Sequence, residues 1–246
     1  ESHATIASEA EFTGSAGNER LGILVSQSGE TADTIAAADQ MKKIGMPLLS
    51  LVNAANSSLE RSSSVTVNIA AGPEIGVAST KAFTAQLASL LRLALLAGVQ
   101  RGHLSQSYVQ EIIDGIQKLP DQMAQYLQGN RMQEHALLFD HARSAIILGK
   151  HAMLPLANEA ALKIKECSYI HTQGYPAGEL KHGPIALIEE GFPVVALCPT
   201  DRSLAKMTSA IEEVTARGAR VLVITDGRDL YTVGQPSELV PDCHPV

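Results

Sequence analysis

The stretch that decides the fold is residues 21–52, LGILVSQSGETADTIAAADQMKKIGMPLLSLV. It opens with an apolar run over residues 21–26, which is typical of a parallel strand buried on both faces, and a short polar turn follows. Residues 32–44 are good helix formers with basic residues in the last turn, and Gly45 ends this helix before a second apolar run, residues 48–52. The stretch therefore predicts one strand–helix–strand unit of a parallel sheet.

The same kind of unit continues along the first half. Residues 65–70 are predicted to form a third strand, and residues 80–99 a long helix with so little charge that we expect it to be buried. Residues 106–127 have the mixed spacing of a connecting helix, in which Pro120 predicts a break or a kink. We place the domain linker in this region.

The second half repeats the pattern. It predicts a strand at residues 145–149 and a helix at residues 156–169, then a strand, a helix and a strand at residues 192–199, 203–217 and 220–226. Strands that alternate with helices in this way predict an α/β protein with parallel sheets, here a duplicated doubly wound domain.

Composition limits the possible partners. The chain has 246 residues, of which 45% are hydrophobic, and a net charge of −7, which argues against binding to nucleic acid or to an anionic membrane. Its three scattered cysteines lack the spacing of a disulfide framework or a zinc site, and no signal peptide is evident. The apolar tract near residues 87–99 is interrupted by Arg92 and is short for a membrane span. We therefore expect a cytoplasmic protein without a metal.

The turn over residues 26–31 has the composition of an anion site. A helix N-terminus offers unpaired backbone N–H groups and a partial positive charge, so it can hold a phosphate dianion without a lysine. Ser26, Ser28 and Thr31 supply hydroxyl groups, and Gly29 allows a close turn of the backbone. The alternative is an ordinary helix cap made by Ser28 or Thr31, with nothing bound.

Two further turns bear on the choice of ligand. Neither a P-loop nor a dinucleotide fingerprint follows a predicted strand, which favours a small phosphorylated metabolite over ATP or NAD. The corresponding turn of the second half, residues 198–203, has Pro199 and Asp201 where hydrogen-bond donors would be needed, so we expect one phosphate site per chain. Residues 79–81 start another predicted helix and would add hydroxyl groups and an amide near Val77, although such a run is more often only a cap.

Candidate catalytic groups lie in the second half. Glu159, Lys163 and Glu166 are spaced i, i+4 and i+7, which places them on one helix face; the alternative is a solvated stripe of ion pairs. The nearby run GELKHGP, residues 178–184, sets His182 in a stretch unsuited to a regular helix. Interconversion of an aldose and a ketose needs a base, a group that opens the ring and a group that stabilises the enediolate, and a carboxylate, a histidine and a lysine can supply them.

Three motifs together resemble the glucosamine-6-phosphate synthase family: SQSGET at residues 26–31, EIGVASTKAFT at residues 74–84 and GELKHGP at residues 178–184. The resemblance runs from about Ala7 to the last predicted strand. It implies two tandem sugar isomerase (SIS) subdomains, each a flavodoxin-like doubly wound parallel sheet flanked by helices. The expected division is residues 1–104, a helical linker over residues 105–130, and residues 131–246.

The resemblance also implies a reaction and the residues that perform it. Fructose-6-phosphate and ammonia would give glucosamine-6-phosphate without a metal or an organic cofactor. The implied substrate-binding residues are Ser26, Gln27, Ser28 and Thr31 for the phosphate, and Val77 and Ser79 for the sugar. Glu166 would be the base, Lys163 would assist it, and His182 would open the ring from the neighbouring subunit of a homodimer.

Departures from the family and two competing readings remain. Relative to that family, the printed sequence has no glutaminase domain, lacks the first strand of the first subdomain and lacks the C-terminal tail with its lysine, so we expect a fragment of a longer enzyme. One alternative is a regulatory SIS module that binds a sugar phosphate without catalysis. The other is a different SIS isomerase or a deglycase, whose pattern usually has a single SIS unit or lacks the run over residues 179–184.

Overall fold

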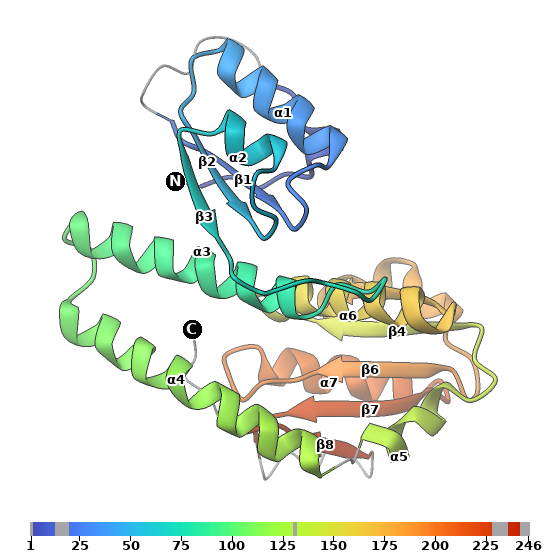
Figure 1. The fold of residues 1–246 in the computed structure, drawn as a ribbon. Coiled ribbons are helices and arrows are strands. Elements are labelled where there is room, and N and C mark those ends of the chain that lie inside the picture. The colour runs from blue at the N-terminus through green and yellow to red at the C-terminus, as the bar shows by residue number, and fades with distance from the viewer. Residues whose placement is uncertain (1, 13–19, 130–131, 228–235, 242–246) are drawn as a thin grey trace. The chain divides into compact units, whose positions relative to one another are not determined.

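The structure is a computed structural model that describes residues 2–12, 20–129, 132–227 and 236–241. The chain divides into two compact units, Glu1–Ser105 and Gln106–Val246, and each is built on a parallel sheet (Figure 1). The helix over the expected linker, α4 (Gln106–Gln128), belongs to the second unit. The exact limits of the two subdomains stay a prediction.

The first unit holds a three-stranded parallel sheet of order β1-β2-β3. Its strands are β1 (Gly22–Ser26), β2 (Leu48–Val52) and β3 (Val65–Asn68). Its main helices are α1 (Ala32–Lys43), which joins β1 to β2, the short α2 (Ser58–Ser62), and α3 (Lys81–Gln100), which follows β3. The predicted strand–helix–strand unit is confirmed, and the carboxyl ends of all three strands lie at the same edge because the strands are parallel.

The central strand β2 explains why helices cover both faces of this sheet. Leu48 and Val52 pack with α1 and α2 on one face, whereas Leu49 and Leu51 pack with α3 on the other. Every residue of β2 is buried, as its continuous apolar run predicted. The sheet is therefore doubly wound.

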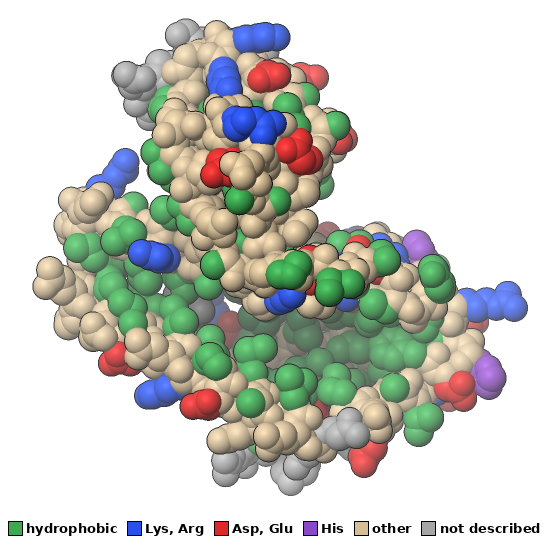
Figure 2. Space-filling model, in the orientation of Figure 1, with side chains coloured by type: hydrophobic (Ala, Val, Ile, Leu, Met, Phe, Trp, Pro, Cys, Tyr) green, Lys and Arg blue, Asp and Glu red, His purple; other side chains and the backbone are tan. Residues whose placement is uncertain are grey.

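Helix α3 is less buried than its sequence suggested. Of its residues only Ala82 and Leu95 are buried, Leu87 and Leu96 are 46% and 52% exposed, and hydrophobic side chains lie on the surface along this helix (Figure 2). The prediction of a buried helix was wrong because a helix on a sheet buries one stripe, and low charge elsewhere does not supply a second covering layer. By length and composition, α3 is the one described helix that would be able to cross a membrane, a property that core helices of soluble proteins share.

The second unit holds a five-stranded parallel sheet of order β5-β4-β6-β7-β8. Its strands are β4 (Ser144–Gly149), β5 (His171–Pro176), β6 (Pro193–Leu197), β7 (Arg220–Thr225) and β8 (Ser237–Leu239). Numbered along the chain, this order is 2-1-3-4-5, the flavodoxin-like arrangement that was expected. Helix α6 (Met153–Ser168) joins β4 to β5, and α7 (Leu204–Thr215) joins β6 to β7.

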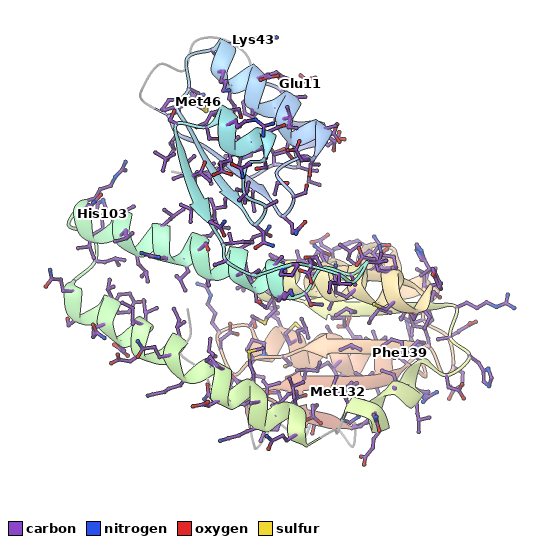
Figure 3. All side chains as sticks on the ribbon, viewed as in Figure 1. Glu11, Lys43, Met46, His103, Met132 and Phe139 are labelled. Atoms are coloured by element: carbon purple, nitrogen blue, oxygen red, sulfur yellow. The ribbon has the colours of Figure 1, made fainter. Side chains whose placement is uncertain are left out.

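Helices again cover both faces of the second sheet. Met207 and Ile211 of α7 lie in the core on one face, and Ala157 and Ala161 of α6 lie in the core on the other. Phe139, labelled in Figure 3, belongs to a short 3-10 helix and packs against the α6 side. Because α6 contacts the sheet through alanines, its backbone lies close to the strands.

Several elements of the second unit differ from expectation. Strand β5 lies in a segment for which no strand was predicted, and the short elements α5 (Met132–Ala136) and β8 had no signal in the sequence. Helix α4 runs unbroken through Pro120, so the predicted break is absent. Pro120 has no N–H to donate, yet the 23-residue helix continues on both sides of it.

Candidate active site

The turn between β1 and α1 folds around its own hydroxyl groups. The Gly29 N–H donates to Ser26 Oγ at 3.0 Å, and the Glu30 N–H donates to Ser28 Oγ at 3.1 Å. Ser26 Oγ and Thr31 Oγ1 lie 3.1 Å apart. The structure therefore brings the three predicted hydroxyl groups together in one turn at the start of α1.

The start of α1 does not have the ordinary cap that the alternative interpretation requires. Thr31 occupies the N-cap position, but its side chain makes no capping hydrogen bond. The Ser28 hydroxyl group binds the Glu30 N–H, which precedes the helix. Neither hydroxyl group thus satisfies the first N–H groups of α1, the groups that bind anions at helix N-termini.

The backbone of this turn is held by the segment that follows β2. Gln27 O accepts hydrogen bonds from the N–H groups of Asn53 and Ala54, at 3.0 and 3.3 Å, and Gly29 O accepts one from Leu59 N at 3.1 Å. The side chain of Gln27 is half-buried. Since three N–H groups of the chain fix its carbonyls, the turn is pre-organised.

Gly29 and Glu30 complete this support. Gly29 has a φ of +66°, and a Cβ atom there would lie 2.2 Å from Ser57 Oγ, so only glycine fits without a shift. The Ser58 N–H donates to Glu30 Oε1 at 2.7 Å. Hydrogen bonds from Ser58, with the charge of Arg61, lower the pKa of Glu30. Glu30 therefore stays ionised and ties α2 to the turn.

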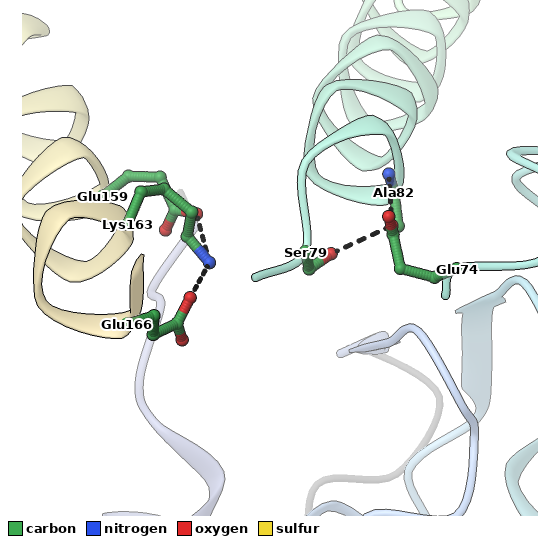
Figure 4. A network of polar contacts seen from close by, with 6 residues as sticks. All are labelled: Glu74, Ser79, Ala82, Glu159, Lys163 and Glu166. Carbon is green, nitrogen blue, oxygen red and sulfur yellow. Dashed lines mark hydrogen bonds and ion pairs between the residues drawn. The ribbon is translucent and has the colours of Figure 1, made fainter. Parts of the chain in front are cut away.

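A second polar network precedes α3 (Figure 4). Glu74 Oε2 accepts hydrogen bonds from the Ala82 N–H at 3.1 Å and from the Ser79 hydroxyl group at 3.3 Å. Thr80, the N-cap residue, makes no capping bond with its side chain, so Glu74 caps the helix instead. Val77 is 93% exposed. Sequence reasoning missed Glu74, although an acidic residue ahead of a helix start is a usable signal.

On α6 the structure brings together the acid–lysine cluster Glu159, Lys163 and Glu166 (Figure 4). Lys163 Nζ lies 2.7 Å from Glu166 Oε2 and 3.5 Å from Glu159 Oε1, and each side chain is about a quarter exposed. Burial alone would lower the pKa of Lys163, but the hydrogen bond to Glu166 and the two carboxylate charges outweigh it and raise that pKa. The cluster is therefore a half-buried ion triad and not a fully solvated stripe.

His182 lies in a short, well-anchored turn. It ends the 3-10 helix Ala177–His182, whose Ala177 and Leu180 are buried in the core, and Gly183 follows with a φ of 138°. The His182 side chain is exposed and makes no hydrogen bond with Glu166 in the part of the chain that the structure describes. Among the described residues, no group of His, Cys, Asp and Glu is placed to hold a metal ion.

The turn between β6 and α7 occupies the position that matches the first turn but is closed by carboxylates. Asp201 Oδ1 accepts a hydrogen bond from Ser203 N at 2.7 Å, and Asp226 Oδ1 accepts bonds from the Thr200 N–H and hydroxyl group at 2.7 and 2.9 Å. The bonds from Ser203 lower the pKa of Asp201. Burial, with the charges of Asp201 and Asp226, raises the pKa of Cys198 to about 11. The carboxylates of Asp201 and Asp226 thus bring negative charge of the protein itself into this turn.

The sequence profile of the SIS domain matches the chain twice, at residues 3–96 and 138–231. The two matches cover most of the chain; the first includes all three strands of the first sheet, and the second includes β4 to β7 of the second sheet. The chain therefore belongs to the SIS domain family, and the prediction of two SIS repeats is confirmed.

Two relatives of the chain carry the same name. The chain is 46% identical over 205 residues to a glutamine–fructose-6-phosphate aminotransferase (isomerizing) of Mesorhizobium japonicum, and 44% identical over 225 residues to that of Pseudomonas aeruginosa. These matches cover 83% and 88% of the chain but 34% and 37% of the relatives, so the chain spans about a third of their length. Both relatives are enzymes by name, and they confirm the resemblance inferred from the three motifs.

Solved structures agree with this assignment. The C-terminal domain of the glucosamine-fructose-6-phosphate aminotransferase from Francisella tularensis matches with a TM-score of 0.89 and 33% identity, over 94% of this chain and 67% of that one. A glucosamine-6-phosphate deaminase from Thermotoga maritima matches with a TM-score of 0.70 and 21% identity, over 94% and 68% of the two chains, and shares the fold.

Proposed function

We propose that this chain is the isomerase part of a glucosamine-6-phosphate synthase. It binds fructose-6-phosphate, isomerises the ketose to an aldose and, with ammonia, gives glucosamine-6-phosphate. The names of the relatives and the two SIS repeats support this choice within the family. The observation that carries it is the pre-organised turn at the start of α1, where three hydroxyl groups accompany a helix start whose N-cap residue, Thr31, makes no capping bond with its side chain.

In this proposal the first unit binds the substrate. The phosphate accepts hydrogen bonds from the turn, and the proposed phosphate-binding residues are Ser26, Gln27, Ser28 and Thr31. Val77 and Ser79 contact the sugar. Support for this role comes from the fixed position of Ser79, whose hydroxyl group is bound to Glu74, and from the exposure of Val77.

The second unit supplies the groups for proton transfer. Glu166 is the base that moves a proton between the first and second carbon atoms of the sugar. Lys163 lies 2.7 Å from it and, because its pKa is raised, brings a permanent positive charge next to the carboxylate. Such a charge also stabilises negative charge that develops on the sugar oxygens as the enediolate forms. The exposed His182 opens the sugar ring, acting across the interface of a homodimer.

The proposal includes the setting of the enzyme. Longer relatives are named for a glutamine-dependent reaction, which supports a glutaminase domain as the source of ammonia in the full-length protein. We propose a cytoplasmic homodimer that needs neither a metal nor an organic cofactor.

Ligand-induced stabilisation tests the proposal. Fructose-6-phosphate, glucose-6-phosphate and glucosamine-6-phosphate should each raise the unfolding temperature, and saturation at 100 times the dissociation constant stabilises by about 2.7 kcal/mol. Fructose, glucose and glucosamine serve as controls and should have no effect, since they lack the phosphate. Equal stabilisation by the unphosphorylated sugars, or none by the phosphorylated set, would reject the proposal.

A second measurement separates the enzyme from its alternatives. Formation of glucosamine-6-phosphate from fructose-6-phosphate and ammonia by the full-length protein distinguishes a synthase from a regulatory SIS module, which would bind the ligand without turnover. If the protein were a different SIS isomerase, it would convert another sugar phosphate faster than it converts fructose-6-phosphate.

A further inference from the structure

We propose that Asn53 is a positioning residue that ties the phosphate-binding turn, residues 26–31, to the segment that contacts the sugar, residues 74–80. The inference rests on the proposed function and deepens it, because it names the residue that sets the distance between the two halves of the substrate site in the first unit. Sequence reasoning gave no role to Asn53, the first residue after β2.

The backbone of Asn53 holds the phosphate-binding turn. Strand β2 is the middle strand of the sheet, so the residue that follows it lies between the ends of β1 and β3. The Asn53 N–H donates to Gln27 O at 3.0 Å. This bond is made by the main chain, so a change of side chain leaves it in place.

The side chain of Asn53 holds the chain that leaves β3. Its Nδ2 donates to Gly72 O at 2.6 Å, and its Oδ1 accepts from the Ala71 N–H at 2.9 Å. A carboxamide has the same donor and acceptor as a peptide group, so Asn53 continues the pairing of β2 with β3 beyond the bond from Ile69 N to Val52 O, at 3.0 Å.

The two side-chain hydrogen bonds of Asn53 lie where the chain changes direction. Ala70 and Gly72 both have positive φ, of 53° and 70°, so the backbone turns sharply twice within three residues. Positive φ is costly for alanine, and such a conformation persists where its surroundings fix it. The two bonds from Asn53 span this turn and set the direction in which the chain runs on to Glu74, which in turn holds Ser79 at 3.3 Å.

The backbone of Asn53 binds the phosphate-binding turn and its side chain binds the chain after β3, so a substitution of the side chain separates the two roles. Asn53→Ala should leave the phosphate-binding turn intact and release only the sugar-contacting segment. In isothermal titration of the full chain, the dissociation constant for fructose-6-phosphate should rise roughly tenfold, because binding must then order a segment that the two lost hydrogen bonds no longer hold. The dissociation constant for inorganic phosphate, which reaches only the turn, should stay within about twofold.

Four further variants sharpen the test. Asn53→Asp keeps the acceptor for Ala71 N but turns a carboxylate oxygen toward Gly72 O, so it should show the same selective loss and serves if the alanine variant does not fold. Gln40→Ala removes an exposed amide from α1 and should change neither constant. Ser79→Ala removes the proposed sugar contact. The double variant Asn53→Ala/Ser79→Ala should have a dissociation constant for fructose-6-phosphate within about twofold of that of the weaker-binding single variant, because both changes act through one segment.

The outcomes distinguish this inference from the proposed function. Selective weakening of fructose-6-phosphate with non-additive coupling to Ser79 supports the role of Asn53. Equal weakening of both ligands, additive effects, or an unchanged sugar phosphate constant would overturn that role while the unmodified protein still binds fructose-6-phosphate. If the unmodified protein binds no fructose-6-phosphate, the proposed function fails, and the inference fails with it.

Discussion

Two turns in this molecule occupy the same place in the fold and differ in what fills them. The turn from β1 to α1 and the turn from β6 to α7 each join a parallel strand to the helix that leads to the next strand. In the first, hydroxyl groups of Ser26 and Ser28 bind neighbouring N–H groups. In the second, the carboxylates of Asp201 and Asp226 bind them.

The difference shows that a helix start in a doubly wound sheet is only a potential anion site. Both helices present a partial positive charge at the N-terminus, and a negative charge there is favourable. At α7 Asp201 supplies that charge by accepting a hydrogen bond from the Ser203 N–H, whereas before α1 the hydroxyl groups of Ser26 and Ser28 accept from N–H groups and the ionised Glu30 is bound to Ser58 of α2. In the proposed function the first turn binds the phosphate, and the second unit carries the acid–lysine cluster.

The variant with the largest expected effect tests whether binding and proton transfer belong to different units. Glu166→Gln keeps the shape of the side chain but removes the base, so turnover of fructose-6-phosphate in the full-length protein should fall about 1,000-fold. Binding of the sugar phosphate, which the proposal assigns to the first turn, should change by less than about threefold. Glu212→Gln, an exposed acid on α7, is the matched control and should leave both unchanged. Retained turnover in the Glu166 variant would refute its assignment as the base.

The next prediction concerns variants that exchange a hydroxyl group and a carboxylate between the two turns. Ser28→Asp places a carboxylate in the first turn, as Asp201 does in the second, and should weaken binding of fructose-6-phosphate by about 100-fold or more, because like charges at close range repel. Asp201→Ser makes the reverse change in the second turn and should leave that binding unaltered. Isothermal titration measures both, and an equal loss in the two variants would contradict the claim of a single phosphate site.

Much of the fold could be predicted because parallel strands covered on both faces must be continuously apolar. Residues 48–52 were predicted as a strand, and β2 has those limits. Strand β5 escaped prediction because its sequence, HTQGYP, contains glycine and proline. A Cβ atom on Gly174 would lie 2.7 Å from the backbone nitrogen of Asn158, so α6 requires a glycine there, and nothing local in the sequence indicates this.

Some residues of the candidate site could likewise be predicted from the sequence, and others could not. The spacing of Glu159, Lys163 and Glu166 is enough to bring them together, since a single helix carries all three. Asn53 could not be found from spacing, because its partners lie 18 and 19 residues away, whereas Glu74 offered a local signal as an acidic residue ahead of a helix start. Contacts made through chain reversals depend on the whole sheet being in place.

The rigidity of the first turn gives the third prediction. Gly29→Ala should lower the free energy of unfolding by about 3 kcal/mol, because the new Cβ both strains a positive φ and meets Ser57 Oγ. Gly45→Ala is the control: its φ of +80° is also positive, but nothing lies within 4 Å, so the loss should be about 1 kcal/mol from strain alone. Urea denaturation measures both. Equal losses would mean that contact with Ser57 does not hold the turn.

The smallest expected effect concerns the charge in the second turn and depends on pH. Because hydrogen bonds from Ser203 lower the pKa of Asp201 in the folded chain, its stabilising contribution is present above the usual pKa of 3.8 and disappears as pH falls through the lowered value. Asp201→Ala should therefore cost about 1 kcal/mol near neutral pH, a magnitude that solvent exposure limits, and progressively less in acid. Ser28→Ala in the first turn removes a neutral acceptor, so its effect on unfolding should not vary with pH over the same range. Urea denaturation at a series of pH values compares the two variants, and parallel pH dependence would mean that the two turns do not differ in charge as the hydrogen bonds indicate.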